Sequence, residues 1–280
     1  MKLNAYAKIN LTLDITGVRP DGFHELRSVM APVTLCDVIE LNKNGSFAFD
    51  CSVKELCGTD NLCVRAAKLF FELSGQNPNV SIYLEKNIPF PAGLGGGSAD
   101  AACVLKGLNE LCGMPLSAEQ LFSLAERLGS DVPFCLLGAP ALCEGRGERL
   151  TSINSLPELD IVIAIGKARL KTPEVFREYD KAGLLARADS DRLLNAIERG
   201  DREEVISSLG NAFEPITDIL APETKEIRKL MLSHSALNAR LSGSGPSVYG
   251  VFENSRAASN CAEALKNIGI FAVCCKTVSK

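Results

Sequence analysis

The sequence predicts a protein of the α+β class with two domains, and three observations support this prediction. The chain has 280 residues, which is enough for one large domain or two modest ones. Its apolar residues recur at every second position in some segments and at helical spacing in others. Residues 152–160 are polar and contain proline, as linkers often do. We therefore expect one domain over residues 1–153 and a second over residues 154–280.

The N-terminal part of the chain is expected to contain several strands. Residues 2–16 place apolar side chains at odd positions and polar side chains at even positions, which indicates a strand with one buried and one polar face. The turn-forming sequence GVRPDGF follows at residues 17–23 and ends this strand. Further strands are expected at residues 28–41, 46–53 and 80–89.

Helical spacing of apolar residues predicts three helices in the same domain. Each of them ends at a glycine, which adopts the left-handed conformation of a helix terminus without strain. Ser117 and Gln120 also form a capping box at the start of the third helix. These helices are expected at residues 61–75, 98–113 and 117–129.

The rest of the chain alternates between strand and helix patterns. A hairpin is expected around two glycines in residues 141–150, and a buried strand follows the linker. Helical segments then extend to about residue 232. The expected C-terminal elements are a strand at 247–252, a helix at 256–269 and a strand at 270–278.

Composition excludes several classes of protein. The formal net charge of −4 argues against a nucleic-acid binder, which needs an excess of lysine and arginine. No apolar run approaches the length of a membrane span, and the N-terminus lacks the apolar core of a signal peptide. The eleven cysteines include no C-x-x-C pair, so no zinc cluster is indicated. We expect a reduced, cytoplasmic protein that is a monomer or a weak dimer.

The sequence PFPAGLGGGSADAA at residues 89–102 runs a glycine cluster directly into helix-forming residues. It departs from the dinucleotide fingerprint because Ser98 stands at the third glycine, and it lacks the lysine of a P-loop. Glycines still let backbone N–H groups converge, and a helix start presents free N–H groups and a positive dipole end. A simple strand-to-helix turn is the alternative, although three consecutive glycines make it entropically costly. The segment therefore predicts an anion site, most naturally for phosphate.

The segment GLGGGSADAA also resembles the phosphate loop of the GHMP small-molecule kinases. LSGSGPSVYGVF is similar to their third motif, and AYAKINLTLDITGVRPDGFHEL, TDNLCVRAAKL, GSDVPFC and CEGRGERL extend the resemblance over most of residues 5–150 and again 240–252. The resemblance implies a ribosomal-S5-like ATP-binding domain, a ferredoxin-like C-terminal α/β domain and an active site in the cleft between them. Residues 180–235 contribute no motif.

The resemblance further implies the parts of a phosphoryl-transfer site for ATP, with Mg²⁺ expected but no metal ligand assigned. Lys8 matches the catalytic-site lysine and Asp131 the general base, whereas the residues alone allow a solvated lysine and an aspartate in a first helical turn. Because carboxylates are weak bases, Asp131 accepts the proton only if a dissociative transition state has loosened it, and otherwise it positions the hydroxyl. The positions implied near ATP are Pro91, Ala92, Gly93, Leu94, Gly95, Gly96, Gly97, Ser98, Ala99, Asn61 and Lys86. Without the resemblance, Ser98 and Asn61 are equally well explained as helix caps and Lys86 as a solvated charge.

The resemblance implies a small-molecule substrate that carries a cytidine diphosphate. Phe23 and Phe176 would stack on the base and His24 would bind its edge, although core packing explains Phe176 equally well. This chain has Phe23 where the resembled kinases commonly have a tyrosine, so the ring face is kept and the hydroxyl is lost. The substrate-binding set is completed by Asn10 and Thr172, and the supporting loop comprises Ser242, Gly243, Ser244 and Gly245.

Three other functions are alternatives to a kinase that acts on a substrate carrying a cytidine diphosphate. A GHMP-type kinase for another alcohol has no need of the base-recognising DGFHEL segment. A non-catalytic sensor has no need of Lys8 together with Asp131. A dinucleotide oxidoreductase is disfavoured by the broken fingerprint.

Overall fold

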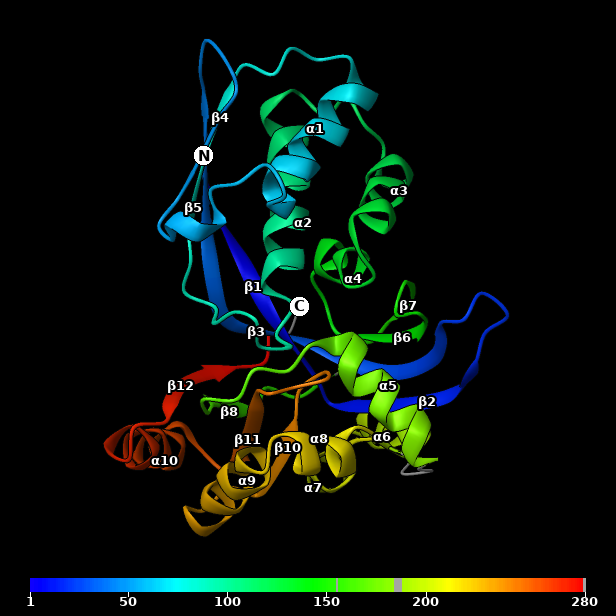
Figure 1. Ribbon diagram of the computed structural model, residues 1–280, viewed down its shortest axis with the longest axis vertical. Helices are drawn as coiled ribbons and strands as arrows, with labels where there is room; N and C mark the ends of the chain where they lie inside the picture. Colours follow the sequence, from blue (N-terminus) through cyan, green and yellow to red (C-terminus); the bar gives the residue numbers. More distant parts are fainter. Residues whose placement is uncertain (155, 184–187, 279–280) are drawn as a thin grey trace. The chain divides into compact units, whose positions relative to one another are not determined.

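The computed structural model describes residues 1–154, 156–183 and 188–278 (Figure 1). These residues form two compact units, each assembled from separate stretches of the chain. The first unit comprises Met1–Ala7, Leu35–Pro89 and Gly95–Gly138, and the second comprises Lys8–Thr34, Phe90–Leu94 and Ala139–Lys280. The predicted domain boundary after residue 153 stays a prediction, and Ser155 of the expected linker lies outside the described residues.

The first unit packs helices against one face of a sheet (Figure 1). The second half of β3 (His24–Lys43) pairs antiparallel with β5 (Val80–Glu85), and β4 (Ala48–Cys51) pairs parallel with β5. The first residues of β1 (Lys2–Asn10) also belong to this unit. The helical elements are η1 (Lys54–Leu56), α1 (Leu62–Ser74), α2 (Gly96–Leu111), α3 (Ala118–Leu128) and α4 (Val132–Leu137).

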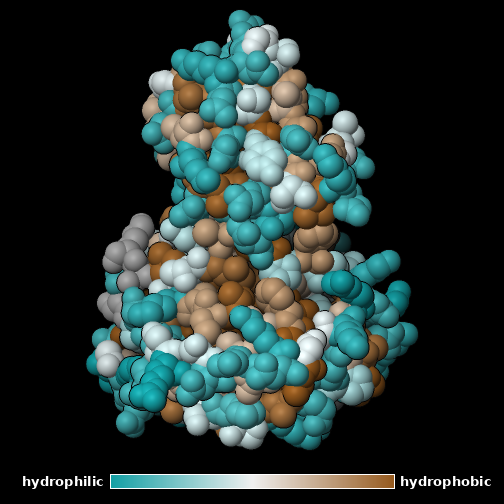
Figure 2. Space-filling view, turned by 90° about the vertical axis from the view of Figure 1, so that its left-hand side faces the viewer, coloured by the Kyte–Doolittle hydropathy of each residue, from teal (hydrophilic) through white to brown (hydrophobic). Residues whose placement is uncertain are grey.

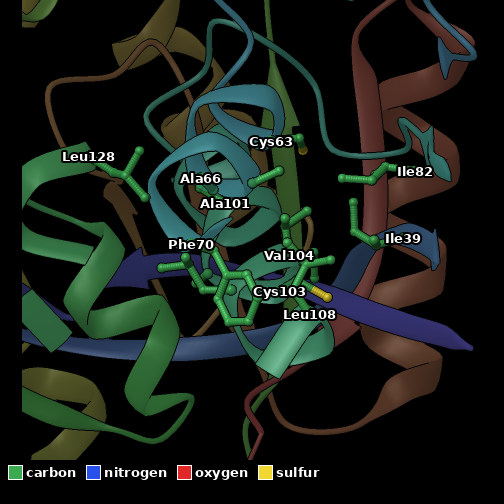
Figure 3. Close-up of a cluster of buried hydrophobic side chains, with 14 of the residues drawn as sticks. Ile39, Cys63, Ala66, Phe70, Ile82, Ala101, Cys103, Val104, Leu108 and Leu128 are labelled. Carbon is green, nitrogen blue, oxygen red and sulfur yellow. The ribbon is translucent and has the colours of Figure 1, made fainter. Parts of the chain in front are cut away.

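The hydrophobic core of this unit lies between those helices and the sheet (Figure 3). Phe70 of α1 and Val104 of α2 are completely buried, and Leu128 of α3 joins them. The sheet contributes Ile39 of β3 and Ile82 of β5 to the same cluster. Burial of such apolar side chains, rather than helix propensity, holds α2 and its glycine-rich start in place.

The second unit is built around an antiparallel sheet with the strand order β10-β11-β8-β12. In chain order these strands are β8 (Asp160–Ile165), β10 (Asn238–Leu241), β11 (Val248–Phe252) and β12 (Phe271–Lys276). The first strand therefore lies between the third and the fourth, and helices follow the first and the third. This is the ferredoxin-like arrangement, as predicted for the C-terminal part.

The second unit also contains a second group of paired strands. β2 (Thr12–Val18) and β6 (Ala141–Gly145) pair antiparallel with the first half of β3, and β6 forms the predicted hairpin with β7 (Arg149–Ser152). β9 (Gly210–Asn211) pairs parallel with β2. The helices are α5 (Thr172–Ala182), α6 (Ser190–Arg199), α7 (Arg202–Ser207), α8 (Glu214–Leu220), α9 (Glu223–Ser233) and α10 (Ser255–Asn267).

The prediction of one continuous strand over residues 2–16 is wrong, and its polar face is partly buried. β1 ends at Asn10 and β2 begins at Thr12. The polar side chains from Lys8 onward are buried, with 4% of Lys8 and none of Asn10 or Thr12 exposed. They face other polar groups instead of water, since Asn10 hydrogen-bonds Ser28 and Thr12 hydrogen-bonds Ser190. Period-two alternation distinguishes two faces but does not reveal that a second layer covers the polar one.

The surface and the cysteines agree with the composition. The face drawn in Figure 2 carries mostly hydrophilic residues with hydrophobic ones scattered among them. None of the helices in the described ranges combines the length and the apolar character that crossing a membrane requires. All eleven cysteines fall within the described residues, and none of them forms a disulfide there.

Candidate functional site

The glycine segment leads directly into α2. Gly93 and Gly95 have φ angles of +72° and +67°, in the left-handed region that favours glycine, and Gly95 is the N-cap residue of α2. Ala99 N donates to Gly95 O at 2.8 Å, so α-helical bonding starts there. The preceding amides of Gly96 and Gly97 and that of Ser98 have no carbonyl one turn earlier in the helix to bind. This helix start has the donors and the dipole of an anion site.

Ser98 is the third residue of α2, so its prediction as a helix cap is wrong. The N-cap position is taken by Gly95, which has no side chain to accept a hydrogen bond. The helix begins two residues earlier than expected because the glycines themselves take helical conformations. The half-buried hydroxyl of Ser98 therefore lies in the first turn, beside the amides just described.

The loop Ser242–Gly245 packs on the backbone of Gly93. A Cβ atom on Gly93 would lie 2.7 Å from Ser242 O and 3.0 Å from Gly245 O, closer than packed atoms approach. The Ser242 hydroxyl donates to Gly93 O at 3.3 Å. A Cβ atom at position 93 would separate the two loops. Glycine is therefore required there by the close approach of the two backbones as well as by its φ angle.

Lys8 lies next to these loops within the second unit. Its backbone N–H donates to Leu94 O at 2.9 Å, which ties β1 to the glycine segment. Its Nζ donates to Asn10 Oδ1 at 2.9 Å. Asn10 Nδ2 in turn donates to Ser28 Oγ at 2.8 Å, and Tyr249 Oη donates to Asn10 O at 3.0 Å. Lys8 is therefore held in a buried hydrogen-bonded network and is not the solvated lysine that its strand position suggests.

Asp131 belongs to the first unit and precedes α4. It occupies the N-cap position with Pro133 in the first turn, but its side chain makes no capping hydrogen bond. Helix capping therefore does not account for an aspartate here. Lys8 and Asp131 lie in different compact units, so the meeting of their side chains stays a prediction.

Lys86 forms a buried ion pair under the start of α2. Its side chain is 4% exposed and donates to Asp37 and, at 2.9 Å, to Asp100 of α2. Asp37 Oδ1 also accepts from the backbone N–H groups of Asn87 and Ile88. Lys86 Nζ would be 3.3 Å from a Cβ atom on Gly96, so the ammonium supports the glycine-rich turn from below. The interpretation of Lys86 as a solvated charge is wrong, and its contact with ATP stays a prediction.

The two carboxylates shift the titration of this cluster. Burial, opposed by the attraction of Lys86 and aided by the negative charge of Asp37, raises the pKa of Asp100 to about 8. Burial alone would lower the pKa of Lys86, but Asp100 and Asp37 outweigh it and raise the pKa. Near neutral pH the raised pKa of Asp100 favours its protonated form beside the Lys86 ammonium.

Asn61 uses both ends of its amide as a helix cap. Its Oδ1 accepts from Cys63 N at 2.8 Å at the start of α1, and its Nδ2 donates to Leu56 O at 2.9 Å. The capping interpretation is therefore confirmed, and a role in holding the nucleotide stays a prediction.

The predicted base-binding residues are only partly assembled. His24 lies against Phe176 of α5 with ring centroids 4.7 Å apart, and its Nε2 is 2.7 Å from Asp180 Oδ1. Phe176 also packs edge-on against Phe213 at 4.8 Å. Phe23 is 54% exposed in its turn, and among the described residues no ring contact joins it to Phe176. Its ring faces the Arg146 guanidinium at 5.1 Å.

Thr172 connects the helix of Phe176 to the second glycine loop. Its hydroxyl is 2.8 Å from that of Ser244, at the start of α5 one turn before Phe176. Nothing in the sequence indicates this pairing, or that Ser28, Asp37 and Tyr249 take part in the networks around Lys8 and Lys86. Asp100 lies inside the glycine motif and was the most accessible clue, because an acidic residue in a phosphate loop demands a partner cation.

No group of three or more histidine, cysteine, aspartate or glutamate side chains within the described ranges is arranged to hold a metal ion. Mg²⁺ in phosphoryl-transfer sites is commonly held by the phosphates with one or two protein oxygens, so it does not require such a cluster. Ser98, in the first turn of α2, offers a hydroxyl oxygen for it. Asp100 does not fit because Lys86 binds its carboxylate in the interior.

Comparison with protein families identifies the class of this protein. A model described as the GHMP kinases N terminal domain matches residues 61–139, and one described as GHMP kinases C terminal matches residues 193–270. The chain belongs to the GHMP kinase family, whose members use ATP. The matched segments lie on either side of the predicted domain boundary.

Individual relatives narrow the comparison further. The chain is 42% identical over 270 residues to the 4-diphosphocytidyl-2-C-methyl-D-erythritol kinase of Caldicellulosiruptor saccharolyticus, covering 95% of this chain and 93% of that one. It is 37% identical to the kinase of the same name from Clostridium tetani, covering 95% and 96% of the two chains. A crystal structure of 4-(cytidine 5'-diphospho)-2C-methyl-D-erythritol kinase matches all of both chains with a TM-score of 0.88 and 37% identity. The mevalonate kinase of L. major, 16% identical with a TM-score of 0.76, shares the fold.

Proposed function

We propose that this protein is an ATP-dependent kinase that phosphorylates the 2-hydroxyl of 4-diphosphocytidyl-2-C-methyl-D-erythritol, in the non-mevalonate route to isoprenoid precursors. The names of its relatives support this substrate. The structural observation that carries the proposal is the packing of two glycine loops beside Lys8, whose backbone binds Leu94 at 2.9 Å. A lysine fixed to the phosphate loop itself is suited to act on a group that approaches the terminal phosphate.

The triphosphate of ATP binds at the start of α2 in this proposal. The amides of Gly96, Gly97 and Ser98 donate to phosphate oxygens, and the helix dipole favours their negative charge. Mg²⁺ supplies charge neutralisation on the phosphates when it is bound. The loop Ser242–Gly245 packs on Gly93 and so supports the glycine segment. Asn61 and Lys86 complete the proposed ATP site.

Lys8 and Asp131 act on the acceptor hydroxyl. The hydroxyl oxygen bonds to the γ-phosphorus while the bond from that phosphorus to the bridging oxygen breaks, and ADP leaves. Asp131 accepts the hydroxyl proton, and Lys8 keeps that carboxylate ionised and orients the hydroxyl. Asn10 and Thr172 help to bind the substrate.

The cytosine is recognised by aromatic side chains. Phe23 stacks on one face of the base, Phe176 covers the other, and His24 binds its edge. The rings of His24 and Phe176 are in contact with each other. Binding of the base between these residues and Phe23 therefore shifts that contact. The guanidinium of Arg146 over the Phe23 ring leaves one ring face for the base.

A substrate panel tests the proposal. The purified protein is incubated with ATP, Mg²⁺ and one of four alcohols, namely the cytidyl substrate, homoserine, mevalonate or galactose, and ADP is measured. We expect ADP only with the cytidyl substrate. ADP with mevalonate alone would assign another GHMP activity, and none with any alcohol despite nucleotide binding would favour a sensor.

The proposal includes the setting in which the enzyme works. We place it in the cytoplasm, since none of its eleven cysteines forms a disulfide among the described residues. We expect it to act on a small molecule, as a monomer or weak dimer that does not require nucleic acid or a membrane. Sedimentation analysis of the reduced protein tests the oligomeric state.

A further inference from the structure

We propose that Ser28 positions Lys8 for catalysis by fixing the orientation of the Asn10 amide between them. The inference rests on the role proposed above for Lys8. Lys8, Asn10 and Ser28 all belong to the second unit, and they are 4%, 0% and 1% exposed. Water therefore does not compete for these hydrogen bonds.

The direction of each hydrogen bond follows from the chemistry of the groups. Ser28 has one hydroxyl hydrogen and donates it to Thr12 O at 2.5 Å, and a carbonyl oxygen can only accept. The Ser28 oxygen must then accept from Asn10 at 2.8 Å, so Asn10 turns its NH₂ group toward Ser28. This leaves Asn10 Oδ1 facing Lys8 Nζ at 2.9 Å, the only orientation that an ammonium donor tolerates.

The backbone around the network is fixed independently of Ser28. Tyr249 Oη donates to Asn10 O at 3.0 Å, and Leu11 N donates to Val29 O at 2.8 Å. Lys8 N is bound to Leu94 O in the glycine segment. Loss of the Ser28 hydroxyl therefore leaves the strands in place. It removes the donor to Thr12 O and the acceptor that holds the Asn10 amide. A freed amide can turn its NH₂ group toward Lys8 and displace the ammonium.

Two substitutions of nearly equal shape separate the hydroxyl from packing. Ser28→Thr keeps the hydroxyl and adds one methyl group, and Ser28→Val adds the same methyl group and puts a second one in place of the hydroxyl. We expect kcat of Ser28→Val to fall by about 10- to 100-fold, as for a small misplacement of a catalytic group, and Ser28→Thr to recover most of that loss. KM for ATP should change little in either variant, because the start of α2 is untouched.

A double-mutant cycle tests whether Ser28 acts through Lys8. If it does, Ser28→Val lowers kcat in the wild-type background but causes no further loss in Lys8→Ala. Ser208→Ala is the matched control, since it removes a buried hydroxyl that has no partner among the described residues of the same unit. Circular dichroism and thermal melting confirm that each variant is folded.

The outcomes distinguish this inference from the proposed function. Equal kcat for Ser28→Val and Ser28→Thr, with Lys8→Ala inactive, would overturn the role of Ser28 and leave that of Lys8 intact. An additive loss in the double variant would do the same. Full activity of Lys8→Ala would overturn the catalytic role of Lys8 and the inference together.

Discussion

Asp131 is the residue whose position is hardest to explain by structure alone. It stands at the N-cap of α4 without capping it, although an aspartate there normally does. Its sequence surroundings resemble those of the general base of GHMP kinases. A capping hydrogen bond therefore does not account for the aspartate, and its proposed role in catalysis rests on that resemblance.

We predict that Asp131→Ala loses most turnover but still binds nucleotide. General-base catalysis commonly contributes about 10²- to 10⁴-fold, so kcat should fall within that range. The triphosphate donors at the start of α2 remain, and nucleotide affinity, measured by calorimetry, should change by less than about threefold. Unchanged turnover would remove Asp131 from the mechanism.

Phe23 is an exposed aromatic residue that the protein does not use for packing. At 54% exposure it contributes little to the core, and its ring contact is with Arg146. We predict that Phe23→Ala raises KM for the cytidyl substrate by about tenfold, since stacking on a base is worth about 1–3 kcal/mol. KM for ATP should stay within about twofold, and Phe23→Tyr should keep the wild-type value. If both KM values rise together, the ring does not recognise the base.

At the scale of elements, the two glycine loops form one structural unit through Gly93. We predict that Gly93→Ala raises KM for ATP by at least about tenfold, because its Cβ would meet Ser242 O at 2.7 Å and push the loops apart. Steady-state kinetics with varied ATP measure this effect.

Gly75→Ala is the matched control for this substitution. Gly75 has a similar φ angle of +66° but no atom within 4 Å of the added Cβ. Both variants should lose about 1 kcal/mol of unfolding free energy from the left-handed backbone, but Gly75→Ala should keep its KM for ATP. Equal KM values would show that loop packing does not shape the nucleotide site.

The sequence predicts helix ends well, because their signals are local. It predicts the environment of the site residues less well, because that depends on partners that are distant in the sequence. Gly75 ends α1 and Ser117 with Gln120 caps α3 as expected, because each signal acts within one helical turn. The environment of Lys86 depends on Asp37, which lies 49 residues away in β3. Nothing in the residues around Lys86 indicates whether that ammonium faces water or a carboxylate.

The alternation in β1 shows the same limit from another side. It correctly predicts which residues face the apolar core, since Ala5, Ala7 and Ile9 are buried. It does not predict that Lys8 and Asn10 are buried too, because that depends on Ser28 and Tyr249 arriving from other parts of the chain. The resemblance to the GHMP kinases indicates Lys8 as a site residue, and the structure shows the hydrogen-bonded network that holds it.

At the scale of the whole molecule, the buried cluster of Lys86, Asp37 and Asp100 makes folding depend on pH. The pKa of Asp100 is raised to about 8 in the folded protein, above its value in the unfolded chain. Between those two values the folded state holds a proton that the unfolded state has lost. Stability therefore falls as pH rises through this window, by up to about 1.4 kcal/mol per pH unit, and levels off above it.

Asp100→Asn should remove that dependence, because the amide hydrogen-bonds Lys86 without titrating. We predict that the unfolding free energy of the variant, measured by urea denaturation at several pH values, exceeds that of the wild type by a margin that grows from pH 5 to pH 8. Asp50→Asn is the control, since Asp50 is exposed and the Cys51 backbone N–H that donates to its carboxylate lowers its pKa. A constant difference between wild type and Asp100→Asn across this range would mean that Asp100 is ionised in the folded protein. Lys86 would then share its charge between two carboxylates next to the loop that we propose to bind phosphate.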